Sequence, residues 1–159
     1  KGLTIVSFSN IINDYIDKNK LGHTEEVHSR LRREFREKYG NEALAVLNKD
    51  YLNETLKENI MVVIEGMRSW EEYLYLKKEF PKVRIVILGL YADKKLRYKR
   101  IAARKYRSHL YGEQRDLNEL AETNVGPTLA FADFMVKNNF SLEDLHDKLE
   151  QIYRIVYFT

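Results

Sequence analysis

Cysteine is absent from all 159 residues, and this absence restricts both the chemistry and the compartment of the protein. Neither a disulfide framework nor a cysteine-ligated zinc site is possible, and a chain without cysteine fits the reducing cytoplasm. The four histidines do not follow the spacing of metal ligands, so we expect them on the surface or at helix ends. The composition therefore predicts a cytoplasmic protein without a histidine–cysteine metal site.

Long apolar runs are missing as well. The longest, such as residues 60–64 and 85–88, are far below the roughly 20 residues that span a bilayer, so no membrane partner is expected. Glycine and proline are few, at 7 and 2 residues, which leaves no long flexible linker. A net charge of +3 is too small to predict a nucleic-acid partner by itself. We therefore expect residues 1–159 to form a single domain.

The sequence does contain an alternation of short apolar segments and longer amphipathic ones. The apolar segments predict strands at residues 4–8, 60–64, 83–88 and 134–136. The amphipathic segments predict helices after Ser9 and at residues 24–39, 41–57, 70–80, 94–104, 113–123 and 141–157. The continuous apolar character of residues 60–64 is typical of a strand buried on both faces. This alternation favours the α/β class, with a parallel sheet covered by helices on both faces.

Parallel sheets bind ligands at the carboxyl ends of their strands, so the residues that follow each strand are candidates. Those after the first two predicted strands are Ser7, Ser9, Asn10, Glu65, Gly66 and Arg68. A carboxylate directly after an apolar strand, as at Glu65, is typical of the magnesium site in P-loop proteins. Gly66 lets a substrate approach the backbone, and Arg68 suits a phosphate group. The alternative is that Glu65 and Arg68 belong to a solvated turn.

Basic side chains are concentrated in the segment from residue 94 to residue 107. On a helix Arg97, Arg100 and Arg104 share one face, which favours convergence on phosphates, although a solvated basic face is the alternative. Arg107 precedes a polar stretch at residues 108–112, as expected of a lid, at about residues 104–123, that closes over phosphates. An ordinary surface loop would have the same composition.

Several of these residues occur in a familiar order. The order runs through residues 7–10, residues 62–69, Ala92-Asp93 with the three arginines, Arg115-Asp116, Gly126 and residues 132–136. Together they resemble the largely archaeal family of adenylate-kinase-related, dephospho-CoA-kinase-like P-loop kinases, over nearly the whole chain. The resemblance implies a three-layer fold of the nucleoside monophosphate kinase type with a basic lid. It also implies transfer of a phosphoryl group from ATP, with Mg²⁺, to an acceptor of the nucleoside monophosphate or dephospho-CoA type.

The resemblance implies roles for individual residues. Catalysis would use Arg68, Arg100, Arg104 and Arg107; acceptor binding Ser7, Ser9, Asn10, Gly66 and Arg68; ATP binding Arg97, Arg100 and Gly126; and the magnesium site Glu65. Three positions depart from the family pattern: Glu65 and Asn10 each replace an aspartate, and Asn13 stands where an arginine is common. The longer Glu65 side chain keeps the charge and changes its reach.

One motif of these kinases is missing: the phosphate loop Gly-x-x-x-x-Gly-Lys-Ser/Thr occurs nowhere in the sequence. In the family this loop follows a first strand in the middle of the sheet, and the strand that resembles residues 4–8 comes one helix later. We therefore expect roughly 20 further residues upstream that carry the loop. The alternative is a non-catalytic relative that binds a nucleotide or nucleic acid with the same fold.

Overall fold

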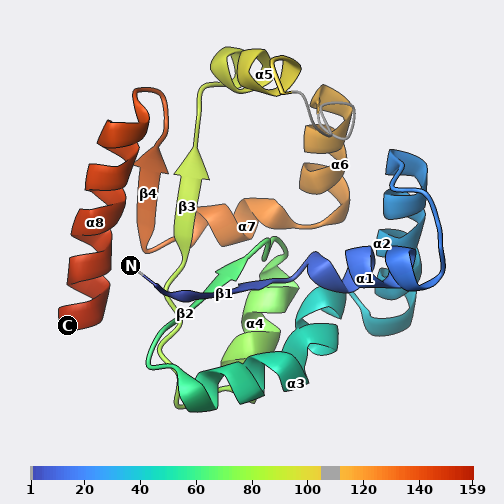
Figure 1. The fold of residues 1–159 in the computed structure, drawn as a ribbon, viewed down its shortest axis with the longest axis horizontal. Helices are drawn as coiled ribbons and strands as arrows, with labels where there is room; N and C mark the ends of the chain where they lie inside the picture. Colours follow the sequence, from blue (N-terminus) through green and yellow to red (C-terminus); the bar gives the residue numbers. More distant parts are fainter. Residues whose placement is uncertain (1, 105–111) are drawn as a thin grey trace.

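The computed structural model describes residues 2–104 and 112–159, and in that part of the chain strands and helices alternate as expected. The strands are β1 (Thr4–Ser7), β2 (Val62–Glu65), β3 (Leu88–Tyr91) and β4 (Phe134–Lys137). The helices are α1 (Asn10–Lys18), α2 (Glu25–Tyr39), α3 (Ala43–Glu58), α4 (Trp70–Glu79), α5 (Lys94–Ala102), α6 (Glu113–Glu122), α7 (Val125–Ala130) and α8 (Leu142–Phe158). The mixed α/β class is confirmed (Figure 1).

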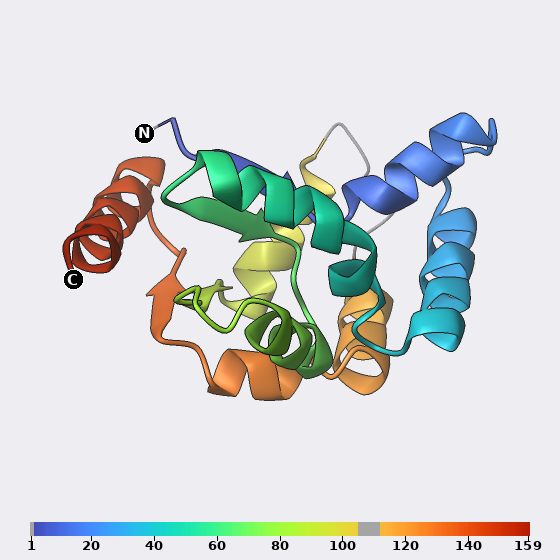
Figure 2. The ribbon, with the colours of Figure 1, turned by 90° about the horizontal axis from the view of Figure 1, so that it is seen from below.

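The strands pair in parallel, as predicted, but within the described residues they form two small sheets in place of one. Thr4 of β1 lies opposite Val62 of β2, and Leu88 of β3 lies opposite Phe134 of β4. Each sheet contains two strands, so β2 and β3 each keep one edge without a partner strand in this part of the chain. The α1–α2 pair and α8 lie at opposite ends of the molecule (Figures 1 and 2).

The main core lies on one face of the β1–β2 sheet. Val6 and Phe8 are fully buried and pack with residues of α3 and α4, including Leu52 and Leu76. The opposite face is open: Ile5 is 60% exposed, and Val63 beside it is 39% exposed. The sequence predicts that the strand at residues 60–64, which corresponds to β2, is buried on both faces. This prediction is wrong for the described chain, because α3 and α4 cover only one face of the sheet.

The third strand begins later than predicted. The sequence favours a strand at residues 83–88, whereas β3 starts at Leu88. The ladder to β4 opens where the backbone N–H of Phe134 donates to the carbonyl of Ile87 (3.2 Å) and the carboxylate of Asp133 accepts from the N–H of Ile87 (2.8 Å). β4 does not extend further back, so among the residues that the structure describes there is no adjacent strand with which residues 83–86 could pair.

Helix α2 is fixed by its cap and by a second core. The side chain of Thr24 accepts from the N–H of Val27 (3.3 Å), which confirms the predicted N-terminus. Leu31 of α2 packs against Ile12 and Ile16 of α1 to form a smaller buried cluster. This packing anchors α2 against α1, so the polar residues of α2 are held in a defined position.

Candidate functional site

Two adjoining cavities, of about 640 Å³ and about 170 Å³, share a wall of four arginines. Arg32 and Arg36 come from α2, Arg68 follows β2, and Arg115 comes from α6. We call the two cavities together the arginine cleft. Its larger cavity has the size of a small-molecule site, and four guanidinium groups suit anionic ligands.

The smaller cavity contains four of the residues expected at the strand ends. Ser9, Glu65, Gly66 and Arg68 all line it, because β1 and β2 are parallel neighbours and their carboxyl ends meet. Ser7 lies beside them, with its hydroxyl oxygen 3.2 Å from that of Ser9. The structure thus brings the acceptor-side candidates of both strands, except Asn10, together at one edge.

Gly66 sets the direction in which the chain leaves β2. Its φ of +86° lies in the left-handed region, which other L residues rarely adopt. A Cβ atom at this position would meet no atom within 4 Å, so the backbone conformation, and not crowding, favours glycine. This turn leads the chain to Arg68 at the cleft.

The backbone at Arg68 is then fixed by the start of α4. The buried carboxylate of Glu72 accepts from the N–H of Arg68 (2.7 Å) and from that of Ser69 (3.0 Å), while the hydroxyl of Ser69 accepts from the N–H of Glu72 (2.9 Å). This is a capping box, and the hydroxyl of Ser69 also donates to the carbonyl of Asn41 (2.8 Å). Burial raises the pKa of the Glu72 carboxyl, while the two backbone donors oppose that shift.

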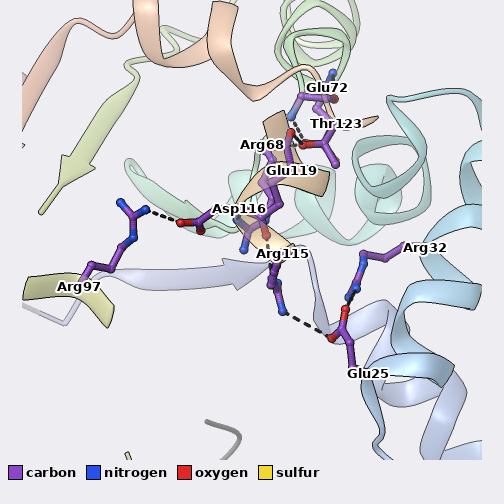
Figure 3. Close-up of polar contacts among 10 residues, drawn as sticks. Glu25, Arg32, Arg68, Glu72, Arg97, Arg115, Asp116, Glu119 and Thr123 are labelled. Atoms are coloured by element: carbon purple, nitrogen blue, oxygen red, sulfur yellow. Dashed lines mark hydrogen bonds and ion pairs between the residues drawn. The ribbon is translucent and has the colours of Figure 1, made fainter. Parts of the chain in front are cut away.

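Ion pairs connect the walls of the cleft (Figure 3). Arg68 donates to one carboxylate oxygen of Glu119 (2.6 Å), and Arg115 donates to the other (2.8 Å). A guanidinium nitrogen of Arg115 lies 3.9 Å from Glu25, whose other oxygen accepts from Arg32 (2.6 Å). Alternating charges therefore run from the β2–α4 connection across α6 to α2.

The larger cavity of the cleft keeps a small excess of positive charge. Its larger cavity is lined by five arginines and four glutamates. Burial lowers the pKa of Arg36, and nearby glutamates only partly offset this desolvation. Within the described chain the guanidinium of Arg36 has no hydrogen bond and no carboxylate within 4 Å. A half-buried cation whose side chain has no direct partner favours the binding of an anion.

The arginines expected to converge on α5 are directed to different partners. Arg97 donates to Asp116 of α6, whereas Arg100 donates to the backbone carbonyls of Asn138 (2.6 Å) and Phe140 (3.2 Å). Arg104 follows α5 and is exposed. These three residues do not line the arginine cleft.

Three further candidates also lie away from the cleft or outside the described residues. Asn10 begins α1 and is exposed, and Gly126 lies within α7. Neither lines the two cavities. Arg107, together with part of the predicted lid, falls outside the described residues. The functional roles expected for these residues stay predictions.

Sequence reasoning missed most of the cleft. Arg32 and Arg36 are four residues apart and therefore share one face of α2, a signal that the sequence contains. Arg115 and Glu119 have the same spacing on α6. The motif Ser69-x-x-Glu72 could also have been recognised as a capping box. Nothing in the sequence alone shows that these helices face each other.

Glu65 fits a role in binding Mg²⁺, because its side chain is exposed and it lines the same cavity as Arg68. In the part of the chain that the structure describes, no group of three His, Asp or Glu residues could hold a metal by itself. Mg²⁺ bound with a nucleotide commonly takes only one or two protein carboxylates, so a single glutamate is compatible with it. An ATP phosphate cradle is not identified, since the sequence has no phosphate loop.

None of the described helices combines the length and the apolar character that crossing a bilayer requires.

Comparison with known proteins gives a consistent set of relatives. The chain is 32% identical to a UPF0200 protein of Methanocaldococcus jannaschii over 94% of this chain and 76% of that protein. It is 29% identical to a UPF0200 protein of Pyrococcus abyssi over 99% of this chain and 86% of the relative, and 27% identical to one of Thermococcus onnurineus over 96% and 84%. No protein-family model matches the chain. On this similarity, the chain belongs to the UPF0200 family, represented here by archaeal proteins.

Proposed function

We propose that this protein transfers the γ-phosphoryl group of ATP to a small nucleotide-like acceptor, and that the arginine cleft binds this acceptor. The observation that supports the proposal most is the meeting of Glu65, Gly66 and Arg68 with arginines of two helices in one cavity system. Phosphoryl transfer depends on positioning and charge neutralisation, and such a cleft offers both.

In this proposal the residues of the chain act by binding and orienting. Arg68 and Arg115 hold the acceptor phosphate, and Arg36 supplies a further guanidinium. The capping box of α4 keeps the backbone of Arg68 fixed, so its side chain approaches the phosphate from a defined direction. Glu65 would hold Mg²⁺ or its water shell at the edge of the same cavity. ATP and Mg²⁺, when bound, would supply the transferable phosphoryl group and neutralise its charge.

The ATP side of the reaction requires a phosphate loop from outside these 159 residues. Two features support the three-layer arrangement that the kinase resemblance implies. First, β2 and β3 each have an edge without a partner strand in the described chain, which a further parallel strand could fill. Second, the open face of the β1–β2 sheet carries the exposed apolar side chains of Ile5 and Val63, which a covering helix would bury.

A second candidate function is a nucleotide-binding module without catalysis. The observation in its favour is the absence of a phosphate loop from the sequence. The coding sequence next to this chain separates the two proposals: a phosphate loop there supports the kinase, and its absence supports the binding module.

The kinase proposal is tested by a coupled assay on the complete gene product with AMP, CMP and dephospho-CoA as acceptors. Transfer to at least one acceptor is expected, and no transfer to any by a folded protein would contradict it. The acceptor site is tested separately by calorimetric titration of AMP into Arg36→Ala, with Arg30→Ala as control. Arg30 lies on the same helix, pairs with Glu34 (3.7 Å) and does not line the cleft.

We expect Arg36→Ala to weaken AMP binding about tenfold or more, because a charge-assisted bond to phosphate is lost. The control should change affinity less than about twofold, because exposed ion pairs contribute little. Equal effects of the two substitutions would show that only the overall charge matters, and would remove the cleft as the binding site.

A further inference from the structure

Glu119 has both of its carboxylate oxygens engaged by arginines from separate parts of the chain. Arg68 follows β2 and bonds one oxygen, while Arg115 lies on α6 and bonds the other (Figure 3). The side chains of Glu119 and Arg115 are only 21% and 18% exposed, so this contact is partly withdrawn from water. Two guanidinium groups around an oxyanion are also the arrangement in which arginines hold a phosphate.

The charge of the cavity indicates what could replace this carboxylate. With five arginines and four glutamates, the larger cavity has a formal charge of one positive unit. Without the Glu119 carboxylate that charge becomes two. A phosphate monoester carries about −1.5 to −2 at neutral pH, whereas a phosphate diester carries one charge. The charge released by removing Glu119 therefore matches a monoester.

Arg36 makes the exchange favourable. It lines the same cavity, and its guanidinium has no hydrogen bond or close ion pair in the described part of the chain. A carboxylate has two oxygens, and both oxygens of Glu119 are already used. A terminal phosphate has three, so it can replace both contacts of Glu119 and still offer an oxygen to Arg36.

We propose that Glu119 occupies the position of a ligand phosphate between Arg68 and Arg115, and that a doubly charged phosphate monoester displaces it on binding. This inference rests on the proposed function, which assigns Arg68 to the acceptor phosphate. It adds the ligand class, a phosphate monoester, and an internal competitor that the ligand must remove.

The test is calorimetric titration of AMP into the wild type, Glu119→Gln and Glu113→Gln. Glu113 is a matched control, because it lies on the same helix, pairs with Lys94 and does not line the cleft. Glu119→Gln should bind AMP about fivefold or more tightly than the wild type, since its amide competes weakly for the arginines. The affinity of Glu113→Gln for AMP should stay within about twofold of that of the wild type. The methyl ester of AMP is a diester with one charge. Its affinity should increase less on the Glu119→Gln substitution than the affinity of AMP does.

A second variant guards against a folding defect in the first. Glu119→Asp keeps the charge but is one methylene shorter, so it reaches the two arginines less well. Displacement predicts that it binds AMP more tightly than the wild type, whereas a purely electrostatic effect predicts unchanged affinity. Thermal unfolding of each variant confirms that the titrated protein is folded.

Titration of Arg68→Ala separates the two proposals. If AMP binds in an Arg68-dependent manner and neither Glu119 variant binds more tightly than the control, the displacement is overturned and the acceptor site stands. If neither the wild type nor Glu119→Gln binds AMP in an Arg68-dependent manner, the acceptor site fails and the displacement fails with it. Tighter, Arg68-dependent binding by both Glu119→Gln and Glu119→Asp supports both proposals. Tighter binding by Glu119→Gln alone is the purely electrostatic effect, which overturns the displacement and leaves the acceptor site standing.

Discussion

Replacing Ser69 by alanine should destabilise the protein more than an ordinary helix cap would. Ser69 is 2% exposed, and its hydroxyl has two partners: it accepts from the N–H of Glu72 (2.9 Å) and donates to the carbonyl of Asn41 (2.8 Å). Loss of an N-cap costs about 1 kcal/mol. The partly buried carbonyl of Asn41, left without its donor, adds a further cost of about 1–3 kcal/mol. The expected total is about 2–4 kcal/mol.

Ser141 provides the control, because it caps α8 in an exposed position. Its hydroxyl accepts from the N–H of Asp144 (3.1 Å), and no second partner is found for it in the described chain. Ser141→Ala should therefore cost only about 1 kcal/mol. Urea unfolding of both variants measures the difference in their free energies of unfolding, provided that the slope of this free energy against urea concentration is unchanged. A loss for Ser69→Ala no larger than that for Ser141→Ala would refute the argument that the Asn41 bond adds to the cap.

Three further predictions concern the same region and the basic helix. Gly66→Ala should cost about 1 kcal/mol because of its φ of +86°, and Gly66→Asn should cost less, since asparagine tolerates this conformation better; equal losses in urea unfolding would contradict the backbone argument. Arg100→Ala should cost about 1–2 kcal/mol through its lost bonds to the Asn138 and Phe140 carbonyls, against about zero for exposed Lys99→Ala. The pKa of Glu72 is raised from 4.5 by burial, so its favourable contribution is present at low pH and is lost as pH rises through the folded pKa. The stability advantage of the wild type over Glu72→Gln should therefore fall as the pH rises above 4.5, and an advantage that grows with pH would contradict this cause.

Local features of the chain were predictable because they depend on neighbouring residues. The cap at Thr24, the stop of α2 before Gly40 and the start of α4 after Ser69 follow from side chains that bond to the backbone a few residues away. The alternation of apolar and amphipathic segments gave the order of strands and helices for the same reason. The placement of Ser9 and Glu65 at the carboxyl ends of parallel strands was also expected, whereas the pairing of β1 with β2, which brings them to one cavity, is a finding of the structure.

Only the tertiary structure decided where each strand ends and how the cleft is built. The start of β3 at Leu88 depends on the length of β4, which lies more than 40 residues away in the sequence. The partners of the arginines depend in the same way on helix packing: Arg97 meets Asp116, and Arg68 meets Glu119 across 51 positions. A charged side chain can pair with any opposite charge within reach, so composition cannot select its partner. The sequence by itself determined which segments fold into strands and helices, and packing determined which of their charges face one another.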